Sequence, residues 1–118
     1  MVTLEEIART ALYGDPLVLR SQVQDWLGAG TSLSDVAIPA TNDPTVLVMS
    51  AALTELFAQR SGQIPPAWTS NIAGLPEPRF LLRSAATMTR LRQMCEEESP
   101  WPLKRRNLFA PADYLSFA

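Results

Sequence analysis

Residues 42–62 read NDPTVLVMSAALTELFAQRSG, and this stretch decides the fold. Asp43 followed by Pro44 is typical of a helix start, because aspartate caps free N–H groups and proline fits the first turn, where its missing N–H costs nothing. Apolar residues then recur at helical spacing, and residues 46–49 are apolar on every side of a helix. Gly62 marks the end. The stretch therefore predicts a buried central helix over about residues 44–61.

Two shorter helices are expected before this one. The first, over residues 4–13, follows a capping box at Thr3, carries its apolar residues on one face and ends at Gly14. The second, over residues 16–27, opens with the same aspartate–proline pair. Gly28 then ends it in the left-handed conformation that glycine adopts easily. The first half of the chain thus predicts a self-consistent helical core.

The second half is interrupted by prolines. Residues 63–78 are expected to form an extended connector, because each residue before a proline is pushed out of the helical region. Helix is expected to resume near Arg79 and to continue to about Glu98, with a break at residues 84–87 as an alternative. If this helix is continuous, it buries one seam and carries one basic stripe. The seam is Leu81, Ala85, Met88, Leu91 and Cys95, and the stripe is Arg79, Arg83 and Arg90.

Composition fits a single globular domain of 118 residues, with 47% hydrophobic and 19% charged residues. No apolar run approaches the roughly 18–20 residues of a membrane span, the N-terminus does not resemble a signal peptide, and a single cysteine fits a reducing cytoplasm. We expect a cytoplasmic all-α protein, a small bundle of four to five helices. Residues 1–62 form its helical core, and residues 63–118 add a proline-rich connector, a helix and a C-terminal tail wrapped on the core.

The residues that usually carry catalysis are missing. Without histidine, the chain lacks the commonest general base and metal ligand. Cys95 alone makes no zinc site, and successive glutamates at 96–98 point in different directions on a helix. We therefore expect no enzyme and no catalytic, cofactor or metal site. An enzyme using carboxylates such as Glu55 or Glu77 is a remote alternative.

The closing run of residues 104–118 is too apolar for a solvated tail and too broken by proline for one helix. It joins cations to aromatic side chains, and interface hot spots favour aromatic residues and arginine. The residues expected to contact a partner protein are Arg79, Arg83, Trp101, Arg105, Arg106, Phe109, Tyr114 and Phe117. The same anchors could instead fold back and complete the protein's own core, and the sequence leaves both readings open.

The order of short motifs in the second half resembles a family of small, uncharacterised bacterial proteins. The motifs are Pro65-Pro66-Ala67-Trp68-Thr69, Gly74-Leu75-Pro76-Glu77-Pro78-Arg79-Phe80-Leu81, Leu91-Arg92, Glu98-Ser99-Pro100, Arg105-Arg106-Asn107-Leu108-Phe109 and Tyr114-Leu115. Genes of this family often lie beside those of nucleotidyltransferase-like toxins of the abortive-infection type. The resemblance covers about residues 44–118. It implies an antitoxin-like role and supplies no catalytic residues.

Three functions follow as hypotheses. The leading one is a non-catalytic protein that binds and neutralises a nucleotidyltransferase-like toxin encoded beside it. The first alternative is a DNA-binding regulator that uses the first two helices, although the acidic first half is a poor nucleic-acid surface. The second alternative is a homo-oligomeric scaffold, in which identical chains exchange their tails. None of the three needs a membrane.

Overall fold

The computed structural model describes residues 2–30 and 32–116, and this part of the chain is mostly helical. In chain order its elements are α1 (Leu4–Tyr13), α2 (Pro16–Gly28), the 3₁₀ turn η1 (Leu33–Asp35), α3 (Pro44–Ser61), α4 (Ala67–Ser70), β1 (Arg79–Phe80), the 3₁₀ turn η2 (Arg83–Ala86), α5 (Thr89–Glu98), α6 (Trp101–Lys104) and β2 (Leu108–Phe109). The expected small all-α fold is confirmed. None of the helices in the described part is long and apolar enough to cross a membrane.

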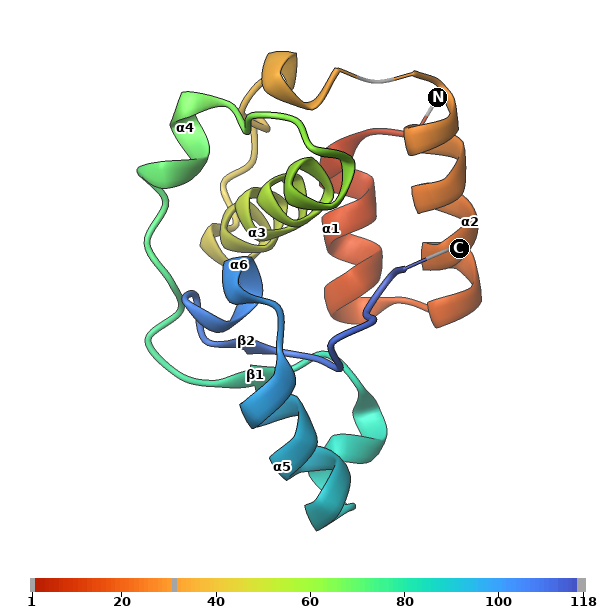
Figure 1. Cartoon of the computed structure of the whole chain (residues 1–118), viewed down its shortest axis with the longest axis vertical. Coiled ribbons are helices and arrows are strands. Elements are labelled where there is room, and N and C mark those ends of the chain that lie inside the picture. The colour runs from red at the N-terminus through yellow and green to blue at the C-terminus, as the bar shows by residue number, and fades with distance from the viewer. Residues whose placement is uncertain (1, 31, 117–118) are drawn as a thin grey trace.

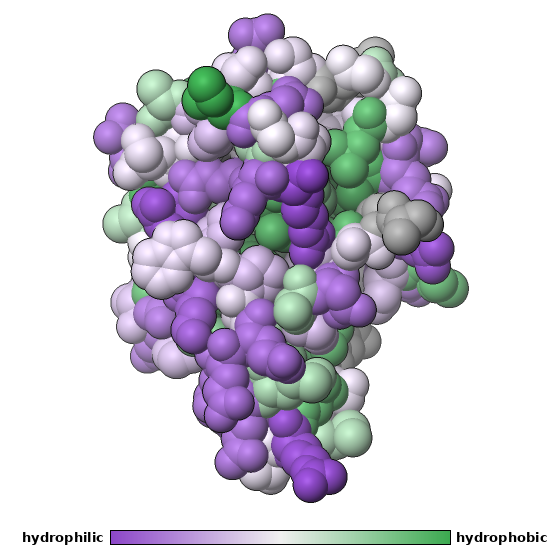
Figure 2. All heavy atoms as spheres, in the orientation of Figure 1, coloured by the Kyte–Doolittle hydropathy of each residue, from purple (hydrophilic) through white to green (hydrophobic). Residues whose placement is uncertain are grey.

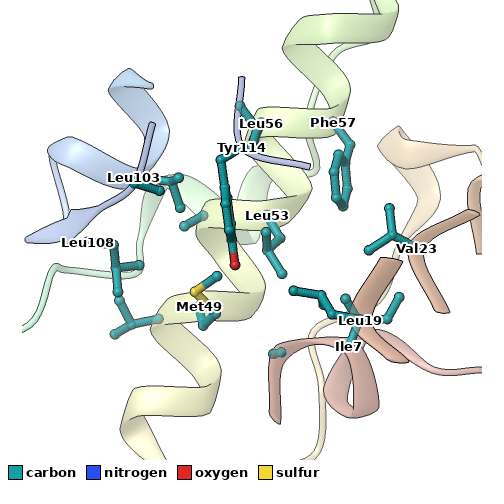
Figure 3. Packing of buried hydrophobic residues seen from close by; sticks show 14 of the residues in the cluster. Ile7, Leu19, Val23, Met49, Leu53, Leu56, Phe57, Leu103, Leu108 and Tyr114 are labelled. Carbon is teal, nitrogen blue, oxygen red and sulfur yellow. The ribbon is translucent and has the colours of Figure 1, made fainter. Parts of the chain in front are cut away.

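Helix α3 occupies the centre of the fold (Figure 1). It contacts α1 on one side and α4 and α6 on the other, while α2 packs on α1. Asp43 caps it by accepting the N–H of Thr45 at 2.9 Å, and Gly62 ends it with φ of 70°. The predicted bounds of this helix are confirmed. Figure 3 shows the apolar side chains that meet around it: Ile7, Leu19, Val23, Met49, Leu53, Leu56, Phe57, Leu103, Leu108 and Tyr114.

The first two helices begin where the sequence predicts. The Thr3 hydroxyl accepts the N–H of Glu6 at 3.2 Å, and the Asp15 carboxylate accepts a backbone N–H of the first turn of α2 at 2.7 Å. The end of α2 differs from the prediction. Gly28 is its last helical residue, and the left-handed conformation falls on Gly30, with φ of 76°.

The connector contains one helical turn that the prolines did not predict. Residues 67–70 form α4, because Pro66 supplies a carbonyl that accepts both the N–H and the hydroxyl of Thr69. Trp68 then fixes the connector to the loop before α3, since its indole N–H donates to the Val36 carbonyl at 2.8 Å. The connector is therefore held against the core at this point.

The expected long helix from Arg79 to Glu98 is wrong in its first half. Residues 79–80 form β1, which pairs in parallel with β2, and only residues 89–98 form α5. The N–H groups of Arg79 and Leu81 donate to carbonyls of the β2 segment at 2.8 and 2.9 Å, and this pairing keeps the backbone here in the extended conformation of a strand. The break that was the alternative is therefore present, and the basic stripe of Arg79, Arg83 and Arg90 does not form on one helix.

Helix α5 and the turn η2 form an arm, residues 83–98, that extends beyond the rest of the protein (Figure 1). Helix α5 packs mainly against η2 rather than against the central helices. After β2 the tail returns along the core, where Leu108, Ala110 and Tyr114 are buried. For residues 104–116 the structure thus selects the reading in which the tail completes the protein's own core.

Candidate functional site

Arg106 is one of the predicted partner contacts, yet its side chain is completely buried. Its guanidinium donates to the Glu55 carboxylate at 2.6 Å and to the carbonyl oxygens of Thr69, Pro102 and Ile72 at 2.7, 3.0 and 3.3 Å. These bonds join α3, the connector, α6 and the tail. We call this group the arginine node. It binds the chain to itself, so Arg106 is not available to a partner.

Glu55 is the anion of the node. Burial raises its pKa, but the hydrogen bond and the charge of Arg106 outweigh burial, so the pKa lies below its ordinary value. The carboxylate is therefore ionised at neutral pH and is committed to an internal ion pair. Arg105 lies at 3.9 Å from the same carboxylate, with a third of its side chain exposed.

Tyr114 was also predicted to contact a partner, and it too lies inside the protein. Only 8% of it is exposed, and burial raises the pKa of its hydroxyl. Arg60 holds this part of the tail by donating to the backbone carbonyls of Tyr114 and Ala112. In this fold both side chains are buried and stabilise the tail on its own core, so the partner contacts predicted for Arg106 and Tyr114 would require the tail to leave the core.

Two further predicted residues are partly committed to the fold. Arg79 donates to the Leu12 carbonyl at 3.0 Å and lies 5.2 Å from the centre of the Tyr13 ring, so it stabilises the C-terminal end of α1. Phe109 stacks on Phe80, with ring centres 5.3 Å apart. Arg79 thus connects the β1–β2 pair to α1, whereas the stack of Phe80 and Phe109 lies within the pair.

Trp101, by contrast, presents 66% of its surface to solvent, and Arg105 is exposed beside the arginine node. They are the predicted contacts that remain accessible among those whose side chains the structure describes. The Arg83 side chain and the whole of Phe117 lie outside the described part, so those two predictions stay as they were.

The arm adds exposed apolar residues that the sequence analysis did not propose as partner contacts. Met88 and Met94 are 55% and 39% exposed, and Leu91 between them is half-buried. Leu91 and Met94 lie about one helical turn apart on α5, and Met88 directly precedes the helix; we call these three residues the arm ridge. The buried seam that was expected here holds for Ala85 and Cys95 and fails for Met88, because the helix starts only at Thr89.

The described residues provide no group of three or more acidic, cysteine or histidine side chains that could hold a metal ion. Cys95 is fully buried in α5. Burial, followed by the charges of Glu96 and Glu98, raises the pKa of its thiol, so the reactive thiolate is disfavoured. Nothing about this cysteine indicates a nucleophile.

No family model, curated protein or solved structure matches this chain. The candidate site is therefore defined by the residues of this fold. It consists of the arm ridge together with Trp101 and Arg105, which follow α5 directly in the chain.

Proposed function

We propose that this protein is a non-catalytic cytoplasmic protein that binds a partner protein through the arm ridge and Trp101. The observation that supports this most is the exposure of Met88, Met94 and Trp101, at 55%, 39% and 66%. Single exposed apolar residues are ordinary. Here three large ones lie within the fourteen residues from the arm to the start of α6, and tryptophan is among the commonest hot-spot residues.

The chemistry of the arm suits protein recognition. Methionine is flexible and polarisable, so the two methionines of the arm ridge can adapt to the shape of a partner. Charged residues flank the arm ridge, among them Arg92 and Glu96, which form an exposed ion pair at 3.4 Å. Figure 2 shows this end of the protein as mainly hydrophilic with hydrophobic side chains alongside. An apolar centre with a polar rim is the usual make-up of such interfaces.

The proposed partner is a nucleotidyltransferase-like toxin encoded beside this protein, which it neutralises by binding. This part of the proposal rests on the motif resemblance of residues 44–118. The exposed positions of Trp101 and Arg105 support it, because both residues belong to that stretch and neither is buried in the core.

Co-expression with the product of the neighbouring gene tests the proposal. The two proteins should co-purify, and the double variant Met94→Ser, Trp101→Ala should lose the complex and the rescue from toxicity while keeping the thermal unfolding midpoint. The matched control is Ile64→Ser, which removes another large apolar side chain, 79% exposed, away from the arm. If the control weakens the complex as much as the double variant, or if the double variant still binds, the arm is not the contact surface.

Self-association is the second candidate function, and the start of α2 favours it over DNA binding. Leu17 and Val18 are 77% and 50% exposed there. A recognition helix would need hydrogen-bond donors for base edges at this point, whereas apolar side chains suit a contact between identical chains. Sedimentation of the isolated protein should give a dimer that Leu17→Ser dissociates if this candidate is right, and a monomer otherwise.

A further inference from the structure

A cavity of about 380 Å³ lies between the α1–α2 corner, the β1–η2 segment and the tail. Its volume falls within the usual range of small-molecule sites. The lining is mainly apolar, with contributions from Leu12, Leu19, Phe80 and Leu81. Arg79 is the one charged side chain among the described residues of the lining. The cavity is thus an apolar chamber with a single cation, and the arm ridge contributes none of its lining.

Tyr114 forms part of the cavity wall and is more than nine-tenths buried. Figure 3 shows its ring reaching away from the tail, with the hydroxyl pointing toward Met49. Its hydroxyl has no hydrogen-bond partner among the described residues, and burial keeps it protonated by raising its pKa. Its oxygen is not among the fully enclosed side-chain atoms that lack a partner in the described part of the chain, so it is open to a partner that enters the cavity. An acceptor atom inside the cavity would satisfy it.

The Arg79 guanidinium also has N–H groups that make no hydrogen bond within the described residues. One terminal nitrogen donates to the Leu12 carbonyl at 3.0 Å, and Nε and the other terminal nitrogen make no hydrogen bond within the described residues. The planar fork of arginine fits the two oxygens of a carboxylate. The cavity therefore combines an apolar body with two donors, one of them cationic.

We propose that this cavity binds a small amphipathic carboxylate. The carboxylate oxygens accept from Arg79 and from the Tyr114 hydroxyl, and the hydrocarbon part packs between α2 and β1, against Leu19, Phe80 and Leu81. The proposal concerns a different surface from the partner contact, so either one can fail without the other.

Calorimetric titration of the full chain with octanoate tests the proposal, with octanol and acetate as matched probes. Octanoate should bind saturably, and each matched probe should bind at least about 10-fold more weakly, because each lacks one half of the recognised chemistry. Tyr114→Phe keeps the ring and should weaken octanoate binding about 3- to 10-fold, the usual effect of one hydrogen bond.

A cavity-filling pair completes the design. Ala11→Leu adds volume at the cavity wall and should abolish binding, whereas Ala67→Leu makes the same change on the exposed face of α4 and should leave binding unchanged. Circular dichroism checks that each variant is folded. The proposal is overturned if octanoate does not bind, if octanol binds as tightly, or if Tyr114→Phe and Ala11→Leu both bind octanoate like the natural chain. Equal binding of octanol would mean that the apolar lining alone is recognised, and unchanged binding by both variants would mean that octanoate binds elsewhere on the protein.

Discussion

Replacing Arg106 by alanine is expected to lower the free energy of unfolding by about 3–5 kcal/mol, the usual cost of breaking a buried ion pair from one side. The change removes a charge-assisted bond to Glu55 and bonds to three backbone carbonyls. The Glu55 side chain, only 11% exposed, would keep its negative charge without its main partner. This loss is a large share of the roughly 5–15 kcal/mol that holds a typical domain together.

Urea unfolding, followed by tryptophan fluorescence, measures the effect as a shift of the midpoint at constant slope. Arg105→Ala is the matched control, because it removes a neighbouring arginine that lies 3.9 Å from the same carboxylate but is partly exposed. The control should cost less than about 1 kcal/mol, as exposed ion pairs do. Equal losses in the two variants, or a loss below about 1 kcal/mol for Arg106→Ala, would refute the assignment of Arg106 as the structural residue of the pair.

The same ion pair should appear in the acid dependence of stability. Because the pKa of Glu55 is lowered in the fold, its stabilising contribution is fully present above its ordinary pKa of 4.5 and is lost as the pH falls below that value. Glu55→Gln cannot ionise, so the variant should be less stable at neutral pH and should lose less stability on acidification. A parallel acid response in the natural chain and the variant would contradict this prediction.

Three further predictions concern single positions. Gly74→Ala should destabilise the protein by about 1–3 kcal/mol in urea unfolding, because a Cβ there would lie 2.6 Å from the backbone of Arg106, whereas Gly28→Ala meets no atom within 4 Å and should stabilise it by roughly 0.5–1 kcal/mol. Asn107→Ala should lower the free energy of unfolding by about 1–2 kcal/mol, because it removes a side-chain hydrogen bond of 2.7 Å to a carbonyl and places alanine at φ of 62°. Asn107→Gly loses the same bond but adopts this φ easily, so it should cost less. Equal costs would show that the backbone conformation does not matter here. Burial raises the pKa of Tyr114, so the stability that is fully present below pH about 10 should fall above it, and Tyr114→Phe should abolish that fall in alkaline thermal melts.

Local rules predict the first half of the fold well. The aspartate–proline starts at residues 15–16 and 43–44 and the stop at Gly62 are contained in a few neighbouring residues, and the structure has helices between them. The error at Gly28 has a local cause. Gly28 and Gly30 are both able to end a helix, and the sequence does not say which of them takes the left-handed conformation.

The second half depends on contacts between distant residues. The segment after Pro78 is apolar enough for a helix, and only its pairing with residues 108–109 makes it a strand. A basic run at residues 104–106 is ordinarily solvated. Arg106 is buried because four carbonyl or carboxylate oxygens accept hydrogen bonds from it. The residues next to Arg106 in the sequence do not predict this arrangement.

The exposure of the candidate contacts also depends on the fold. The sequence proposes Trp101 as a contact but does not decide its exposure, because Trp101 begins α6 while the neighbouring Pro102 is buried. The exposure of Met88 and Met94 depends on where α5 begins and on how little of it the core covers.

The arginine node also bears on how long the native state lasts. Its members lie up to 51 residues apart along the chain, so the node closes only after α3, the connector and the tail have docked. Because three separate segments must be in place first, we expect the node to close after the transition state for folding. The node should therefore contribute little to the folding rate and mainly slow unfolding. A protein built in this way releases its tail rarely, whether or not a partner is bound to the arm.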